Sequence, residues 1–246
     1  EVSSVLENCT YDATMVFLPK YQLDRKLYES VNKVLEALGG KWNKKSKGHV
    51  FEYDPLEAVD EALTSGYAVD QKKALNFFET PVNVAERMIS VSDISNGDYV
   101  LEPSCGHGAL VGEILKSVET VDVCEINERT VKRVIDFFGA NHISHVGNDF
   151  LLYTPEKLYD RIVANPPFSR QQDVLHVSHM LDMLNVGGVV VSVMSAGITF
   201  RDNSLVRDLK QKLYDGFDFK IKALPEGSFK ESGTLVNTVI LKAQKR

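Results

Sequence analysis

From about residue 77 to residue 246, short apolar segments alternate with segments whose apolar residues recur at helical spacing. This alternation predicts strands at residues 99–102, 120–125, 143–146, 161–164 and 189–194. Helices are expected around them, at residues 82–90, 109–115, 128–138, 174–184 and 205–214. Repeated strand–helix–strand units build a parallel sheet with helices on both faces, so we expect an α/β fold.

The two ends of the chain depart from this alternation. Strands are expected at residues 217–224 and 235–241 with no helix between them, which predicts an antiparallel hairpin at one edge of the sheet. The periodicity of residues 1–75 predicts a separate small α/β unit. A polar linker is expected at 70–73, before the domain at 76–246. The elements expected in this unit are a strand at 15–18, a helix at 23–38, a hairpin at 41–53 and a helix at 55–65.

A glycine-containing loop follows the expected strand at 99–102. Glu102 ends that strand, and Gly106 and Gly108 would let a ligand approach the backbone closely. A tight turn or a nicotinamide or flavin site would also fit two such glycines. A carboxylate at Glu102 would oppose the pyrophosphate of a dinucleotide, whereas the ammonium and sulfonium of S-adenosylmethionine tolerate or attract it. Glu125, at the end of the next strand, can accept hydrogen bonds from ribose hydroxyls in either case.

The tetrapeptide Asn165, Pro166, Pro167 and Phe168 directly follows the apolar strand at 161–164. Two prolines can simply end a strand, but this position is expected beside the glycine loop. Methylation of an adenine amine needs acceptors for the amino hydrogens, because the nitrogen lone pair is delocalised into the ring. The Asn165 side chain and the Pro166 carbonyl can supply them, and Phe168 can stack on the base. The tetrapeptide therefore favours methyl transfer to a planar exocyclic amine.

Residues 77–246 resemble the S-adenosylmethionine-dependent N6-adenine DNA methyltransferases of the NPPF type. The matching residues occur in that family's order: 79–81, 102–108, Glu125, 148–150, 165–168, 224–229 and 233–234. The resemblance implies a class I methyltransferase fold, with a Rossmann-like seven-stranded sheet that has an antiparallel edge strand. It also implies an enzyme that flips adenine out of DNA and methylates N6, using S-adenosyl-L-methionine as its cofactor.

The resemblance assigns roles to individual residues. By residue type, Thr80 is expected to cap the helix at 82–90 with Pro81 at the first helical position, and the resemblance implies that Thr80 also holds the methionine carboxylate. Ile126 would pack on the adenine of the cofactor. Asp149 would accept a hydrogen bond from the amine of that adenine, and Phe150 would pack nearby. The implied cofactor-binding residues are Thr80, Glu102, Pro103, Gly106, Gly108, Glu125, Ile126, Asp149, Phe150 and Asn165. The implied catalytic residues are 165–168, with Phe168 and Phe229 on either side of the target base.

The sequence has no room for the large target-recognition region usual in that family. We therefore expect either slight specificity or recognition through loops, a partner or residues 1–75. This departure argues against a restriction-modification role and favours an orphan enzyme, for example one encoded by a phage or a mobile element. Related tetrapeptides also occur in enzymes that methylate RNA bases or a protein glutamine amide. A catalytically idle, nucleic-acid-binding partner subunit is a further alternative.

Charge and composition limit the possible partners. The net charge of −6 excludes a protein that coats nucleic acid through bulk positive charge. A local patch is present in the expected hairpin, where Lys44, Lys45 and Lys47 follow Trp42 and could contact DNA phosphates while the ring stacks on a base. The alternative is a solvated turn with Trp42 buried beneath it.

The cysteines and the hydropathy of the chain indicate in which cellular compartment we expect the protein. The three cysteines, Cys9, Cys105 and Cys124, include no CxxC spacing, so neither a disulfide framework nor a metal site is expected. No segment reaches the ~18 consecutive apolar residues of a membrane span, so no membrane partner is expected. We expect a cytoplasmic protein in a reducing compartment, either a monomer or a small oligomer.

Overall fold

The computed structural model of the chain describes residues 2–51, 54–56, 59, 62–63, 79–230 and 236–246. The chain divides into two compact units, Glu1–Phe77 and Phe78–Arg246. The expected linker at 70–73 lies outside the described residues, as does much of the expected helix at 55–65. In the described part of the chain, every helix is too short or too polar to span a lipid bilayer.

The N-terminal unit is built on a small antiparallel sheet with the strand order β1-β2-β4-β3. Its elements are α1 (Val2–Glu7), β1 (Thr10–Asp12), β2 (Met15–Phe17), α2 (Arg25–Ala37), β3 (Lys41–Asn43) and β4 (Gly48–Val50). The helix α2 begins where the Asp24 carboxylate accepts a hydrogen bond from the Leu27 amide. Its buried face, with Val31 and Leu35, packs with Val16 and Phe51 in the core of this unit.

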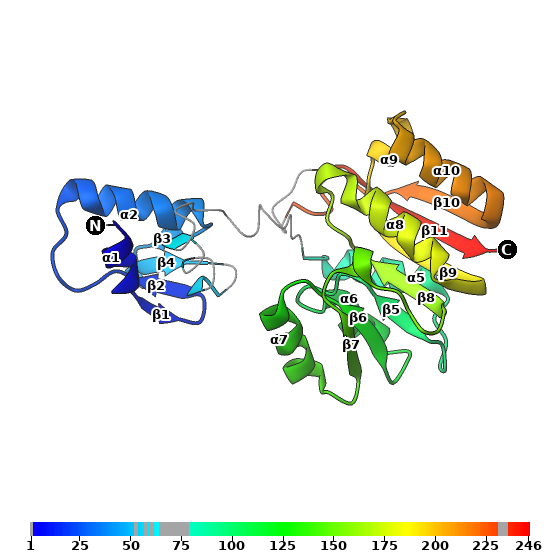
Figure 1. Ribbon diagram of the computed structural model, residues 1–246, viewed down its shortest axis with the longest axis horizontal. Helices are drawn as coiled ribbons and strands as arrows, with labels where there is room; N and C mark the ends of the chain where they lie inside the picture. Colours follow the sequence, from blue (N-terminus) through cyan, green and yellow to red (C-terminus); the bar gives the residue numbers. More distant parts are fainter. Residues whose placement is uncertain (1, 52–53, 57–58, 60–61, 64–78, 231–235) are drawn as a thin grey trace. The chain divides into compact units, whose positions relative to one another are not determined.

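The second unit is a seven-stranded sheet in the order β10-β11-β9-β8-β5-β6-β7 (Figure 1). The strands are β5 (Val100–Glu102), β6 (Val121–Cys124), β7 (Ile143–Gly147), β8 (Tyr159–Ala164), β9 (Leu184–Ser195), β10 (Phe217–Ala223) and β11 (Thr238–Lys245). Neighbouring strands from β9 to β7 pair in parallel, whereas β11 pairs antiparallel with both β9 and β10. The predicted parallel α/β sheet with an antiparallel hairpin at one edge is confirmed.

Helices cover both faces of this sheet. The α-helices are α5 (Val82–Ser92), α6 (Ala109–Ile114), α7 (Glu128–Phe138), α8 (Gln172–Asp182), α9 (Gly197–Phe200) and α10 (Ser204–Gly216), with 3₁₀ turns η1 (Phe150–Leu152) and η2 (Ser169–Gln171). Apolar residues of α5, α6 and α7 form one buried core with the sheet, and those of α8 and α10 form the other. Burial on both faces explains why the central strands are almost continuously apolar.

The start of α5 differs from the sequence prediction. The prediction that Thr80 caps this helix with Pro81 at its first position is wrong, because Pro81 itself is the N-cap and no side chain caps the helix. The Thr80 hydroxyl instead accepts a hydrogen bond from the side chain of Asn165, so a tertiary contact replaces the expected local one.

Candidate active site

The candidate site lies at the carboxyl ends of β5, β6 and β8. Strand β5 has β6 on one side and β8 on the other, and the chain builds outward from β5 in both directions. This makes the β5–β8 boundary a topological switch point, the position at which open α/β sheets generally bind their ligands. Glu102 ends β5 and Asn165 directly follows β8, so the sheet brings the glycine loop and the tetrapeptide at 165–168 together.

The loop after β5 is a compact turn held by backbone hydrogen bonds. The Cys105 amide donates to the Cys124 carbonyl at the end of β6 (3.1 Å), and the Gly108 amide donates to the Cys105 carbonyl (2.8 Å). Gly106 and Gly108 have φ values of 49° and 84°, in the left-handed region that favours glycine. A Cβ at Gly108 would also lie 2.8 Å from the Phe138 ring. Close packing and backbone conformation both require glycine at the start of α6.

The carboxylate of Glu125 is fixed against this loop. One of its oxygens accepts from the Gly106 amide and the other from the Asn127 amide, each at 2.9 Å. Burial raises the pKa of Glu125, and the two amide hydrogen bonds act in the opposite direction. A carboxylate has further lone pairs, so Glu125 can still accept from a ligand's hydroxyl groups. Ile126, the next residue, is 58% exposed and offers an apolar surface beside it.

Glu102 is buried at the carboxyl end of β5, with only 2% of its surface exposed. Among the described residues, its Oε2 atom has no hydrogen-bond partner. Burial, and secondly the negative charge of Glu125, hold the pKa of Glu102 well above its usual range. A buried acid with an unsatisfied oxygen is stabilised by a cationic donor. The ammonium group of S-adenosylmethionine is such a donor, so this residue fits the cofactor.

Asn165 is positioned by a residue far away in the sequence. Its Nδ2 donates to Thr80 Oγ1 across 3.0 Å, and Thr80 is itself buried. Because the amide nitrogen is directed to Thr80, the hydrogen-bond network assigns the oxygen to the other end of the carboxamide group, pointing away from the Thr80 hydroxyl. The sequence indicated both residues but not their contact, because nothing in either local pattern encodes a bond across 85 residues.

Phe168 and Phe229 do lie side by side. Their rings meet edge to face, with centroids 6.2 Å apart and an interplanar angle of 87°. Phe229 is 1% exposed and belongs to the core that contains Leu224 and Ile240. The two rings thus do not present parallel faces to a base in this arrangement. Phe168 is only partly buried and can offer a stacking face, whereas contact between Phe229 and a base stays a prediction.

The remaining expected cofactor residues follow β7. Asp149 is exposed, and its Oδ1 accepts from the Leu151 amide at 2.9 Å, which shapes the turn η1. Phe150 is buried, with its ring centroid 5.2 Å from that of His176 and 4.9 Å from that of His179 on α8. Asp149 and Ile126 are therefore accessible, while Phe150 is buried against α8.

The lysine hairpin, which we define as residues 41–50, belongs to the N-terminal unit. Lys44, Lys45 and Lys47 are exposed in the turn between β3 and β4, where the Asn43 side chain accepts from the amides of Lys45 and Ser46. Trp42 is 41% exposed, and its ring packs edge to face on buried His49. The alternative that Trp42 is buried under the turn is therefore wrong.

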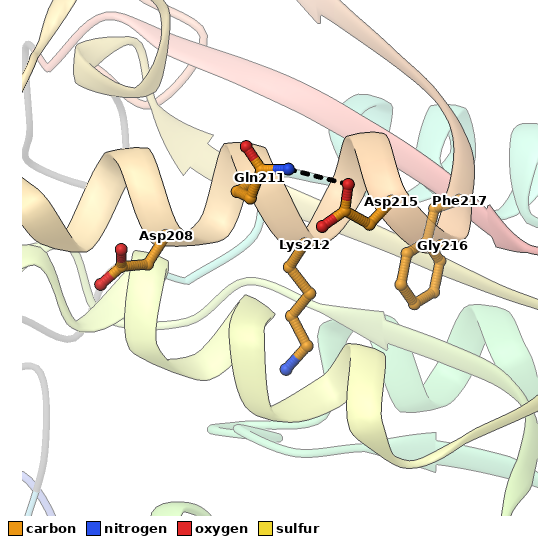
Figure 2. Close-up of a pocket in the computed structure, with 6 residues that line it drawn as sticks. All are labelled: Asp208, Gln211, Lys212, Asp215, Gly216 and Phe217. Carbon is orange, nitrogen blue, oxygen red and sulfur yellow. Dashed lines mark hydrogen bonds between the residues drawn. The ribbon is translucent and has the colours of Figure 1, made fainter.

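A surface pocket lies at the other end of the sheet, beside α10 (Figure 2). Its lining residues are Asp208, Gln211, Lys212, Asp215, Gly216 and Phe217. The Lys212 ammonium is paired with Asp182 (2.6 Å), and the Gln211 amide donates to Asp215 (2.8 Å). Phe217 begins β10, so this pocket lies at the amino ends of the parallel strands, away from Glu102 and Asn165.

Comparisons with known proteins agree with this geometry. The family model described as "Methyltransferase small domain" matches residues 85–211. Ribosomal RNA small subunit methyltransferase A of Corynebacterium diphtheriae is 25% identical over 199 residues, 78% of this chain and 65% of that protein. Curated relatives of this kind match over 32% to 65% of their own length.

Two solved structures illustrate the shared fold. A dimethyladenosine transferase from Plasmodium falciparum is 18% identical with a TM-score of 0.54, covering 69% of this chain and 63% of that one. The methyltransferase subunit of a type I restriction-modification system from Streptococcus thermophilus is 19% identical with a TM-score of 0.57, covering 69% and 44%. At these identities the likeness shows the class I methyltransferase fold alone.

Proposed function

The chain belongs to the methyltransferase small domain family, whose methyl donor is S-adenosylmethionine, and we propose that it methylates the N6 amine of adenine in a nucleic acid. RNA is the first candidate substrate. The observation that carries the proposal is the Asn165 side chain, held by Thr80 at the end of β8, beside the buried acid Glu102 on the neighbouring strand.

The residues around the glycine loop would hold the cofactor. Glu102 would receive its ammonium group, and Glu125 would accept from its ribose hydroxyls. Ile126 and Asp149 would contact its adenine, with Phe150 behind them. Gly106 and Gly108 give the loop its left-handed backbone turns beside these groups, and Pro103 stiffens the turn.

The tetrapeptide would act on the amine. Asn165 Oδ1 and the Pro166 carbonyl would accept the two amino hydrogens, which favours a pyramidal nitrogen with an available lone pair. Phe168 would stack on the base and orient the nitrogen. When bound, S-adenosylmethionine would supply the methyl group: Asn165 and Pro166 would hold the nitrogen while its bond to the methyl carbon forms and the carbon–sulfur bond breaks, and one amino proton would then pass to water. No side chain is needed as a general base, because the methylated ammonium is a strong acid.

The choice of RNA rests on the relatives. Curated relatives that match include ribosomal RNA small subunit methyltransferases, and a dimethyladenosine transferase shares the fold. DNA adenine is the second candidate, because the motifs at 79–81, 102–108 and 165–168 resemble the NPPF-type DNA enzymes and a type I modification subunit shares the fold. Both substrates present the same amine, so the same residues would serve either one.

The lysine hairpin would contribute to nucleic-acid binding in either case. Its three exposed lysines can neutralise phosphates and Trp42 can stack on an unpaired base. Because the whole chain is acidic, such a local patch would supply much of the salt-dependent affinity.

Labelled S-adenosylmethionine would test the function directly. The full chain is incubated separately with ribosomal RNA, single-stranded DNA, duplex DNA and a release-factor protein, and the products are digested and identified. N6-methylated adenosine from RNA supports the first candidate, and the deoxynucleoside supports the second. Label in a protein glutamine alone, or cofactor binding without transfer to any substrate, would contradict the proposal.

A further inference from the structure

The short helix α9 lies beside the tetrapeptide at 165–168, although no motif marks it in the sequence. Strand β9 pairs in parallel with β8, Ser192 opposite Ala164, and continues to Ser195 before α9 begins. The loop carrying α9 and the loop carrying Phe168 therefore leave adjacent strands at the same edge of the sheet. Figure 1 shows α9 at the same end of the sheet as the start of α8.

Two side-chain hydrogen bonds fasten these loops to one another. The Ser195 amide donates to Asp173 Oδ2 on α8 (2.8 Å), and Asn203 Nδ2 donates to Gln171 Oε1 (2.8 Å). Asn203 Oδ1 also accepts from the Val206 amide and so caps α10. Asp173 is 2% exposed, so the acceptor of the first of these bonds is buried. The position of α9 relative to the tetrapeptide is thus fixed on both sides.

The helix α9 presents one large apolar side chain to solvent. Ile198 is 2% exposed and anchors the helix in the core, whereas Phe200, two residues later, is 74% exposed. A single exposed phenylalanine is common on protein surfaces. Phe200 is distinguished by its surroundings, because exposed Arg201 follows it and exposed Arg170 belongs to the loop fastened beside it.

The backbone of that neighbouring loop is strained. Arg170 and Gln171 are consecutive non-glycine residues with φ values of 49° and 60°. Left-handed conformations are unfavourable for residues other than glycine, and such strained residues cluster at ligand-binding sites. Here they turn the chain sharply between Phe168 and α8, leaving Arg170 exposed while Gln171 bonds to Asn203.

We propose that Phe200 stacks on the base next to the target adenine, with Arg170 and Arg201 on the flanking phosphates. This inference rests on the proposed function. A base turned out of its stack loses contact with both neighbours, and an aromatic side chain at the vacated position recovers part of that loss. An exposed ring on a fixed helix, flanked by cations at the edge of the site, has the chemistry for this role, and its occupant is a nucleobase.

The test compares Phe200→Ala, Phe200→Trp and a matched control, Phe137→Ala, in the full chain. Phe137 is also an exposed phenylalanine, 82% accessible, but it lies at the far end of α7. For the nucleic acid that the unaltered protein methylates, Phe200→Ala should lower kcat/KM about tenfold or more, the size of one base–aromatic stack. Phe200→Trp keeps an aromatic ring and should have a kcat/KM close to that of the unaltered protein, and so should Phe137→Ala. All three variants should bind S-adenosylmethionine with the affinity of the unaltered protein.

Two results would overturn the inference: unchanged kcat/KM in Phe200→Ala, or a loss that Phe200→Trp does not restore. Loss of cofactor affinity in Phe200→Ala would also overturn it, because the residue would then act on the fold of the site. Failure of the proposed function looks different, since the unaltered protein would then methylate no nucleic acid.

Discussion

The side-chain amide of Asn165 donates a hydrogen bond to the hydroxyl of Thr80 across 3.0 Å, joining the loop after β8 to the residue before Pro81. A primary amide that is free to rotate presents oxygen and nitrogen to a substrate in turn. With its nitrogen engaged by Thr80, Asn165 presents one orientation only. In the proposed function Thr80 would therefore be a positioning residue for Asn165, whose oxygen would accept a hydrogen bond from the substrate amine.

Replacing Thr80 by valine should misorient Asn165 while keeping the shape of the side chain. We expect kcat to fall about tenfold, the worth of one hydrogen bond, with a smaller change in KM for the nucleic acid. Thr80→Ser keeps the hydroxyl and should restore kcat. A loss confined to S-adenosylmethionine affinity, with kcat unchanged, would instead favour the direct cofactor contact that the sequence motif implied.

Replacing Glu102 by glutamine should leave the stability of the fold equal or greater while weakening the binding of S-adenosylmethionine. The pKa of Glu102 is raised, so between its ordinary value of 4.5 and the raised value the folded chain holds a proton that the unfolded chain releases. The free energy of unfolding therefore falls as the pH rises through this window. Glu102→Gln removes that penalty, and denaturant titrations at neutral pH should show equal or greater stability.

Cofactor affinity should change in the opposite direction. Loss of the charged partner for the ammonium should weaken S-adenosylmethionine binding by about 10- to 100-fold at neutral pH. In the unaltered protein the affinity should rise with pH as Glu102 ionises, and in Glu102→Gln this dependence should be reduced. Isothermal titration over a pH series measures both effects; equal affinity in the two proteins would remove Glu102 from the cofactor site.

Replacing Lys44, Lys45 and Lys47 by alanine should weaken nucleic-acid binding and lower its salt dependence. Each phosphate contact that is lost reduces the slope of log K against log salt by roughly 0.7–0.9. Lys20, Lys26 and Lys33, all exposed in the same unit, provide a control triple variant with the same change in charge. Equal effects of the two triple variants would show that only net charge matters.

Asp122 should be a main determinant of stability in the sheet. Its Oδ2 accepts from the hydroxyls of Tyr99 and Tyr159, and Tyr153 bonds to Tyr159, so one carboxylate serves a buried network. Asp122→Ala leaves these hydroxyls without their acceptor and should cost about 2–3 kcal/mol of unfolding free energy. Tyr153→Phe, at the edge of the network, should cost less. A negligible loss in Asp122→Ala by chemical denaturation would contradict this view.

Much of the fold of the second unit, Phe78–Arg246, could be predicted from the sequence because its central strands are buried on both faces. Apolar runs such as residues 189–194 mark the strands directly, and the positions of Glu102, Glu125 and Asn165 at strand ends place them on one edge of the sheet. A parallel sheet converts position along the chain into position in space, so motifs far apart in sequence could be expected to meet.

Features set by tertiary contacts could not be predicted. Thr80 before Pro81 has the local pattern of an N-cap, but its hydroxyl bonds to Asn165. The edge-to-face packing of Phe168 on Phe229 depends on how the segment after β10 packs on the core. The helix α9 is too short to show a periodicity, and its place beside the tetrapeptide comes from the bonds of Asp173 and Asn203.

The central claim is that the Asn165 side chain accepts a hydrogen bond from the amine that is methylated. Measuring methyl transfer by Asn165→Ala tests this claim most directly. The variant and the unaltered protein are given the same labelled S-adenosylmethionine and the same accepted nucleic acid, and single-turnover rates are measured beside cofactor affinity. The account predicts a rate lowered by about 100-fold or more, because an acceptor for the developing charge is lost, with cofactor affinity largely intact. A single-turnover rate close to that of the unaltered protein would contradict it.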